Sequence, residues 1–165
     1  MKTGRHKTWK AGVWLGVLMV AAVVAAAVFF RAKPMIEPVN NPRIASISAT
    51  VGRDGETYDA DIPESEISDE LNDALISRFL HAEMRNGIFP YPQTYPVSDG
   101  SVSLSIKVSL DDADRLSMRV NLSSLPDYNS AQFGDSHYRI VGHQSLYQDV
   151  YALLSDVIPA YAVKR

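Results

Sequence analysis

The longest uncharged run places the strongest constraint on this chain. The twenty consecutive residues from Ala11 to Phe30 carry no charged side chain. A helix rises about 1.5 Å per residue, so a run of this length spans roughly 30 Å, the thickness of the hydrocarbon core of a bilayer. The run therefore predicts a single transmembrane helix over residues 11–30.

The charges that flank this run predict its orientation. Residues 1–10 carry four Lys or Arg side chains and no carboxylate, and basic residues concentrate on the cytoplasmic side of membrane spans. We therefore expect a cytoplasmic tail at 1–10, an uncleaved signal-anchor in the cell membrane at 11–30, and an extracytoplasmic remainder. The alternative is a cleaved secretory signal, because Ala25, Ala26 and Ala27 place small residues after an apolar stretch.

Small residues inside the uncharged run are typical of helices that pack closely in membranes. Gly12 and Gly16 form one GxxxG pattern, which allows two helix backbones to approach each other. We therefore expect these two glycines to contact a second membrane helix. The alternative is that small residues are simply common in membrane spans.

Charge and cysteine content exclude several classes of function. The chain has no cysteine, so it forms no disulfide, thiolate metal site or cysteine nucleophile. Residues 34–165 hold all 19 carboxylates and only ten Lys or Arg, a net charge of −9. Nucleic-acid binding depends on clustered basic residues, so we expect no nucleic-acid partner. No cofactor is predicted either.

Two segments after the uncharged run predict a tether and a first hairpin. Residues 31–43 contain three prolines and no apolar period, which predicts an extended tether before a domain at 44–165. Apolar residues alternate over 44–51 and 56–62, with Ala45, Ile47, Ala49 and Val51 on one face. A four-residue turn at 52–55 would pair Val51 with Glu56 and place Ala49 opposite Tyr58.

Helical periodicity appears twice in this domain. A stripe through Ile67, Leu71, Leu75 and Phe79 predicts a helix from about Pro63 to the Asn86-Gly87 stop signal. A second helix is expected from Ser145, which forms a capping-box pattern with Gln148, to its end at Pro159. His81 is expected on the polar face of the first helix.

The clearest alternation predicts a second hairpin. Apolar residues occupy every second position over 102–110 and again over 116–122. Both sets face the same side only if the loop has three residues, 111–113, or five, 111–115. We favour three, because five would place Lys107 opposite Arg119.

The expected fold class is an α+β, two-layer domain. A short fifth strand at 137–141 completes the order β-β-α-β-β-(β)-α. We expect a mostly antiparallel sheet with two helices on one face, preceded by the transmembrane helix.

Two groups of residues are candidates for chemistry. Nine carboxylates fall between Asp54 and Asp73, which favours either a weak calcium site or a solvated turn followed by an acidic helix start. Asp135, His137 and His143 share a face of any extended strand, as zinc ligands or acid-base groups would, or as ordinary surface side chains. We predict neither a metal site nor catalytic residues from these patterns.

Two surfaces are candidates for binding. Phe89, Tyr91 and Tyr95 lie in a proline-rich segment at 88–97 and would present aromatic anchors to a partner, or pack over the domain's own core. The outer face of the second hairpin is rich in small polar residues and would accept another protein, or remain a solvated sheet face. Its residues are Ser103, Ser105, Ser109, Ser117, Asn121 and Ser123.

These patterns favour a binding function over catalysis. We expect a single-pass membrane protein with an extracytoplasmic, non-catalytic accessory domain for assembly or sensing, and a membrane or envelope protein as its partner. The alternative is a membrane-tethered or secreted hydrolase that acts on envelope material, with Asp135, His137 and His143 or the acidic cluster supplying acid-base groups.

Overall fold

The computed structural model describes residues 5–36, 41–87, 98–110, 116–125, 128–141 and 145–165, with side chains from position 13 onward. The chain divides at Arg31 into two compact units. The first unit contains helix α1, Arg5–Phe29. Large apolar side chains of α1, such as Leu15, Leu18 and Met19, are about two-thirds exposed. In the part of the chain that the structure describes, no helix combines the length and apolar character needed to cross a bilayer.

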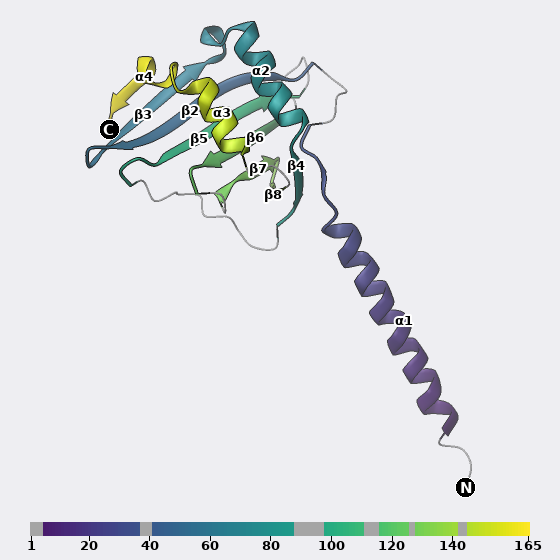
Figure 1. Cartoon of the computed structure of the whole chain (residues 1–165). Helices are drawn as coiled ribbons and strands as arrows, with labels where there is room; N and C mark the ends of the chain where they lie inside the picture. The colour runs from purple at the N-terminus through teal and green to yellow at the C-terminus, as the bar shows by residue number, and fades with distance from the viewer. Residues whose placement is uncertain (1–4, 37–40, 88–97, 111–115, 126–127, 142–144) are drawn as a thin grey trace. The chain divides into compact units, whose positions relative to one another are not determined.

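The second unit is built on one antiparallel sheet of nine strands, in the order β1-β4-β8-β7-β6-β5-β2-β3-β9 (Figure 1). Strands β5 to β8 form a meander, and the β2–β3 hairpin extends the sheet beyond β5. The strands are β1 Lys33–Pro34, β2 Arg43–Arg53, β3 Glu56–Pro63, β4 Glu83–Asn86, β5 Val102–Ser109, β6 Ser117–Ser123, β7 Ser130–Phe133, β8 Ser136–Val141 and β9 Ala162–Lys164. The predicted α+β class with a mostly antiparallel sheet is confirmed.

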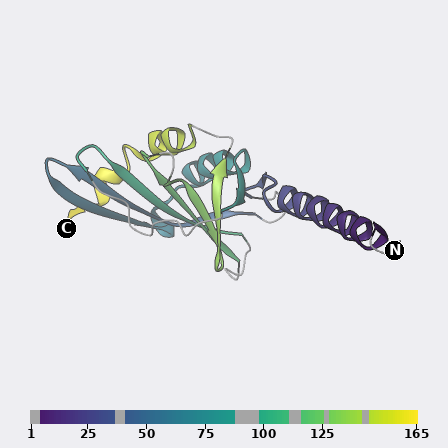
Figure 2. The same ribbon diagram turned by 90° about the horizontal axis from the view of Figure 1, so that it is seen from below.

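Helices cover one face of this sheet. Figure 2 shows the two longer helices, α2 and α3, on the same side of the strands. Their buried residues, including Leu75, Phe79, Val150 and Leu154, join the alternating apolar residues of β2, β5 and β6 in one core. The helical elements are the 3-10 turn η1 Glu64–Glu66, α2 Asp69–Leu80, α3 Leu146–Leu154 and α4 Ile158–Tyr161.

The first hairpin exists, but its predicted register is wrong. Arg53 pairs with Glu56, so the turn has two residues and not four, and Val51 lies opposite Tyr58. Asp54 and Gly55 both have positive φ angles, 55° and 74°. Asp-Gly strongly favours such a type I′ turn, whose twist matches that of the strands. The apolar faces still coincide, because the shift is an even number of residues.

A bulge near the start of β2 places Ile44 on the apolar face of the sheet, where Ala45 was predicted. The register shifts between Ile44 and Ser46, so that Ile44 is 1% exposed in the core where Ala45 was expected. The backbone N–H of Ile44 donates to the side-chain oxygen of Asn72, at 2.8 Å. Asn72 lies on α2, so this hydrogen bond joins the helix to the bulged strand.

The first predicted helix is shorter than expected at both ends. Helix α2 begins after Ser68, whose hydroxyl accepts from the Leu71 N–H, and ends at Leu80. Beyond it, β4 occupies residues 83–86 and pairs with β8, so the Asn86-Gly87 signal ends a strand. Met84 fits the helical stripe by spacing, yet it enters the core from that strand.

The second hairpin has the longer of the two predicted loops. Ser109 pairs with Ser117, and the backbone N–H of Leu110 donates to the Leu116 carbonyl. The loop between Leu110 and Leu116 therefore has five residues, 111–115. The three-residue loop was therefore the wrong choice. Lys107 does lie opposite Arg119.

The C-terminal helix is divided into two pieces. Helix α3 ends at Leu154, and Pro159 lies in the first turn of α4 instead of ending the helix. Proline fits this position because its missing N–H is not needed there. The predicted capping box is also wrong, since Ser145 bonds the Asp149 side chain and caps no backbone N–H. The predicted fifth strand is β8.

The segment expected to form a tether joins the domain in part. Lys33 and Pro34 form edge strand β1 beside β4. Met35 and Ile36 are each 3% exposed and belong to the core. The apolar pair Met35-Ile36 is too short to show a period, which explains why the sequence pattern indicated no structure there.

Candidate functional site

The sheet has a second face, which we call the polar face. Alternation along each strand sends the apolar side chains toward α2 and α3 and the intervening polar ones to the opposite side. Its central residues are Ser48 and Thr50 on β2, Ser103, Ser105, Lys107 and Ser109 on β5, Ser117, Arg119, Asn121 and Ser123 on β6, and Ser130 and Gln132 on β7. The Ser-rich surface expected on one hairpin therefore extends over four strands.

The strand register aligns these side chains in rows across the sheet. Ser48 lies opposite Ser105, which lies opposite Asn121, which lies opposite Ser130. A second row runs from Ser46 through Lys107 and Arg119 to Gln132. The polar face thus presents rows of hydroxyl and amide groups, and one of these rows contains Lys107 and Arg119.

Several small side chains of the polar face are enclosed by their neighbours. Ser109, Ser123 and Ser130 are 1%, 4% and 2% exposed. The backbone N–H of Ser123 donates to the buried side-chain oxygen of Asn129 at 2.8 Å, which ends β6 in a fixed geometry. A surface held this firmly presents its remaining donors and acceptors in a preorganised arrangement.

A shallow hollow of about 200 Å³ lies at one end of the polar face. Lys107, Arg119, Ser117, Gln132 and Gly134 contribute to its lining. The Gln132 amide donates to the Gly134 carbonyl at 3.2 Å, so the β7 side of the hollow is tied to the following turn. Lys107 and Arg119 are both exposed. The hollow therefore offers two cations and two neutral polar side chains from three adjacent strands.

Charge is distributed unevenly over the polar face. The alternating positions of β5, β6, β7 and β8 on this side hold Lys107, Arg119, His137 and Arg139 and no carboxylate. On β3, Asp59 lies opposite Thr50 and accepts a hydrogen bond from it at 2.9 Å. The cationic part of the face is therefore separated from the acidic β3 by β2.

The predicted aromatic and glycine sites are mostly outside the described part of the chain. Phe89, Tyr91 and Tyr95 lie in the segment 88–97, which the structure does not describe. Gly12 lies in α1, but before position 13, where the description of side chains begins. A Cβ added to Gly16 would meet no atom within 4 Å. These residues remain predictions.

The structure separates the acidic cluster into individual pairs. Glu64 forms an ion pair with Arg43 at 3.3 Å, Asp59 with Arg165 at 3.6 Å, and Glu66 accepts a hydrogen bond from Tyr161. Within the described residues, no three His, Cys, Asp or Glu side chains are placed to hold a metal ion. His137 lies exposed on β8, His143 is outside the described residues, and His81 caps α2 with its Nδ1 2.7 Å from the Ser77 carbonyl.

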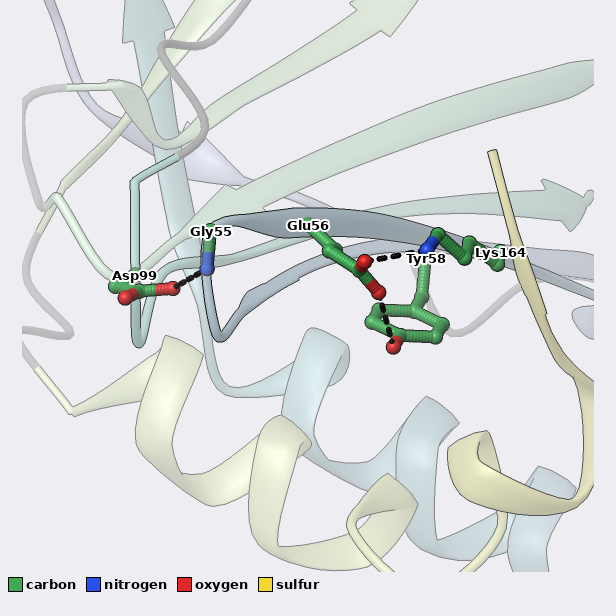
Figure 3. Close-up of polar contacts among 5 residues, drawn as sticks. All are labelled: Gly55, Glu56, Tyr58, Asp99 and Lys164. Atoms are coloured by element: carbon green, nitrogen blue, oxygen red, sulfur yellow. Dashed lines mark hydrogen bonds and ion pairs between the residues drawn. The ribbon is translucent and has the colours of Figure 1, made fainter.

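Near its tip the first hairpin carries two groups of polar contacts (Figure 3). Glu56 accepts hydrogen bonds from Lys164 and, at 2.9 Å, from the Tyr58 hydroxyl. The Asp99 carboxylate accepts from the Gly55 N–H at 2.8 Å. Lys164 lowers the pKa of the Glu56 carboxyl, with Tyr58 as the second cause, and Glu56 raises the pKa of Tyr58. These contacts stabilise the hairpin against β9 and the segment before β5.

Sequence reasoning missed both the hollow and this contact set. Lys164 is 108 residues from Glu56, and β9 is too short for alternation to indicate it. The hollow depends on the pairing of Arg119 with Gln132 across a loop whose length no pattern fixes. The only available signal was that Lys107 and Arg119 alternate with core residues among the serines of the two strands.

Comparison with known proteins returned no relative of this chain: no protein-family model, curated protein or solved structure matches it.

Proposed function

We propose that this chain is a single-pass membrane protein whose outer domain binds a partner protein through the polar face. One observation carries the proposal: helices α2 and α3 cover one face of the sheet, whereas no described helix covers the other (Figure 2). On the described strands β5, β6 and β7, this face consists of small or neutral polar side chains, with Lys107 and Arg119 as its cations. A surface of this kind is suited to another folded protein.

The size of the hollow favours a protein over a small ligand. Sites that enclose small molecules have volumes of roughly 300–1,000 Å³ and are concave and largely apolar. The hollow on the polar face has about 200 Å³ and is open to solvent. It accommodates one side chain of a larger partner, while the surrounding Ser and Asn side chains supply the hydrogen bonds that protein interfaces contain.

The membrane assignment in this proposal rests on the sequence. The twenty residues from Ala11 to Phe30 lack charge, and the four basic residues before them favour a cytoplasmic N-terminal side. An integral anchor at 11–30 would hold the domain at the outer surface of the cell membrane. There its partner would be another membrane or envelope protein, and the domain would act as an accessory in assembly or sensing, without catalysis.

Photo-crosslinking in native membranes tests the binding surface. A photoreactive amino acid at Ser105 or Asn121 would report on the centre of the polar face, and one at Asp73, exposed on α2, is the matched control. We expect a discrete protein adduct from positions 105 and 121 and none from position 73. Equal adducts from all three positions, or none from 105 and 121, would contradict the proposal.

Single introduced cysteines test the topology, because the chain has none of its own. We expect a membrane-impermeant maleimide to label Asp135→Cys in intact cells, and Thr3→Cys only after permeabilisation. The intact mass of the purified protein distinguishes an anchor from a cleaved signal, since cleavage after Ala27 would remove the first 27 residues. A mass that begins at Val28 would overturn the anchor.

The predicted helix contact has its own test. Gly12→Leu together with Gly16→Leu would block close approach of a second helix. We expect this variant to recover less partner than the wild type in mild detergent, with the chain still inserted in the membrane. Unchanged recovery would restrict the interface to the outer domain.

A further inference from the structure

The hollow on the polar face contains an unfavourable pair of cations. Lys107 and Arg119 lie directly opposite each other on β5 and β6. Side chains in this relation have Cβ atoms about 5 Å apart, and like charges there destabilise a sheet. Elsewhere in the described domain several arginines and lysines have carboxylate partners, among them Arg43, Arg53, Lys164 and Arg165. Within the described residues, neither Lys107 nor Arg119 has an ion-pair partner.

The surroundings of this pair favour an anion. Ser117 and Gln132 line the same hollow, and His137 follows Gln132 in the row on β8. The described strands β5, β6 and β7 carry no carboxylate. Asp135 lies in the turn beside Gly134, and the undescribed loop 111–115 carries three aspartates. Arginine binds carboxylates in a bidentate manner, and lysine adds a point charge, so together they suit a negatively charged oxygen group.

We propose that Lys107 and Arg119 bind a carboxylate of an acidic segment in the partner protein. This inference rests on the proposed function and adds the chemistry of the partner. The hollow of about 200 Å³ accommodates one acidic side chain. The neighbouring row of Ser105 and Asn121 provides hydrogen-bond partners for the backbone of the same segment.

An acidic protein segment fits better than an anionic membrane surface. Each Lys or Arg near such a surface contributes only about 1 kcal/mol, so membrane binding needs a cluster of many cations. The hollow supplies two, and residues 34–165 carry a net charge of −9 that opposes any extended anionic surface. A short acidic peptide at the hollow is repelled little by the rest of the domain, because salt screens the interaction between charges more than about 8 Å apart.

Fluorescence anisotropy with a defined probe tests the proposal. The probe is a fluorescein-labelled peptide of alternating Glu and Ser, titrated with the full chain in a non-ionic detergent, and the same peptide with Gln in place of Glu is the reference. We expect the Glu peptide to bind at least tenfold more tightly than the Gln peptide. Lys107→Gln combined with Arg119→Gln should abolish that difference.

A matched variant distinguishes peptide binding at the hollow from general electrostatic attraction to the domain. Arg53→Gln combined with Arg78→Gln removes the same number of exposed cations from the hairpin tip and from α2. We expect this control to bind the Glu peptide as the wild type does, and circular dichroism should show that all variants are folded. Equal loss in both double variants, or no loss in the Lys107/Arg119 variant, would overturn the proposal.

A vesicle experiment decides between the two sources of negative charge. Vesicles of phosphatidylglycerol and phosphatidylcholine should not retain the full chain reconstituted in separate neutral nanodiscs. Retention that depends on Lys107 and Arg119 would assign the hollow to lipid headgroups and reject a protein segment.

Crosslinking and peptide binding together distinguish the two proposals. If crosslinks form at positions 105 and 121 but the double variant binds the peptide normally, the binding surface stands and the carboxylate site fails. If no crosslinks form at these positions but the double variant loses peptide binding, the carboxylate site stands and the wider binding surface fails.

Discussion

At the scale of single residues, the hairpin tip shows how one carboxylate is tuned by its neighbours. Glu56 receives hydrogen bonds from Lys164 and Tyr58, and its pKa lies below the ordinary value of 4.5. A carboxyl whose pKa is lower in the folded state stabilises the fold above the pKa of the unfolded chain. That contribution is lost as the pH falls through the folded value.

Replacing this carboxyl should therefore alter stability in a pH-dependent way. We expect Glu56→Gln to lower the melting temperature near neutral pH and to have a smaller effect as the pH falls through the lowered pKa of Glu56, where the wild-type carboxyl becomes protonated as well. Thermal unfolding followed by circular dichroism between about pH 3 and pH 7 measures this difference. Asp61→Asn, an exposed change on the same strand, is the control. A destabilisation independent of pH would mean that packing, and not charge, holds this contact.

Backbone conformation at the neighbouring residue makes a second prediction. Gly55 has a φ angle of +74°, and nothing lies within 4 Å of an added Cβ. The left-handed region disfavours residues with a Cβ by roughly 1–2 kcal/mol. We expect Gly55→Ala to lower the free energy of unfolding by about 1 kcal/mol in urea titrations, by conformation alone. Asp54→Asn, whose side chain tolerates a positive φ, should be nearly neutral, and equal losses in both variants would contradict this explanation.

At the scale of elements, the two long helices of the domain begin in different ways. The Ser68 hydroxyl accepts from the Leu71 N–H at 3.2 Å, whereas Ser145 caps no backbone N–H. Loss of a capping hydroxyl reduces stability by about 0.5–2 kcal/mol. We expect the loss of unfolding free energy to lie in this range for Ser68→Ala and below it for Ser145→Ala, as measured by urea unfolding. A larger loss at Ser145 would show that its bond to Asp149 stabilises α3 more than a cap does.

Alternation and helical spacing predict most elements here but not their registers. The β5 and β6 strands follow from a strict period of two, and the stripe through Leu75 and Phe79 predicts α2. The error in the first hairpin came from reading Gly52 and Arg53 as turn residues, although Asp54-Gly55 alone satisfies the left-handed turn. The bulge at Ile44 could not be predicted from local alternation, because there the Ile44 N–H donates a hydrogen bond to Asn72, 28 residues away on α2.

The candidate site was predicted only in part for a related reason. The Ser-rich outer face of one hairpin was evident from the sequence, because its small polar residues alternate with core residues. The hollow was not, since it requires β7 to lie beside β6 with Gln132 opposite Arg119. The two short edge strands β1 and β9 contain too few residues for any period to appear.

At the scale of the whole domain, one side chain joins the two layers. Phe79 is fully buried on α2 in the common core of helices and sheet. Phe→Ala changes in such positions reduce stability by about 3–5 kcal/mol, against a total of roughly 5–15 kcal/mol for a typical domain. We expect Phe79→Ala to lose cooperative thermal unfolding or to melt at least 10 °C lower, by the usual size scaling. Leu80→Ala, at a 37% exposed position next to it, should have little effect.

The strand order also determines how the domain responds to mechanical load. Strand β1 and strand β9 form opposite edges of the sheet, so a pull between residues 32 and 165 acts across the hydrogen-bond ladders in series. The outermost ladders are the shortest, with two residue pairs between β1 and β4 and three between β9 and β3, compared with seven between β5 and β6. Under tension the edges would peel away first and lengthen the chain, while the central strands that carry the polar face keep their shape. A partner held on that face would stay bound as the domain extends.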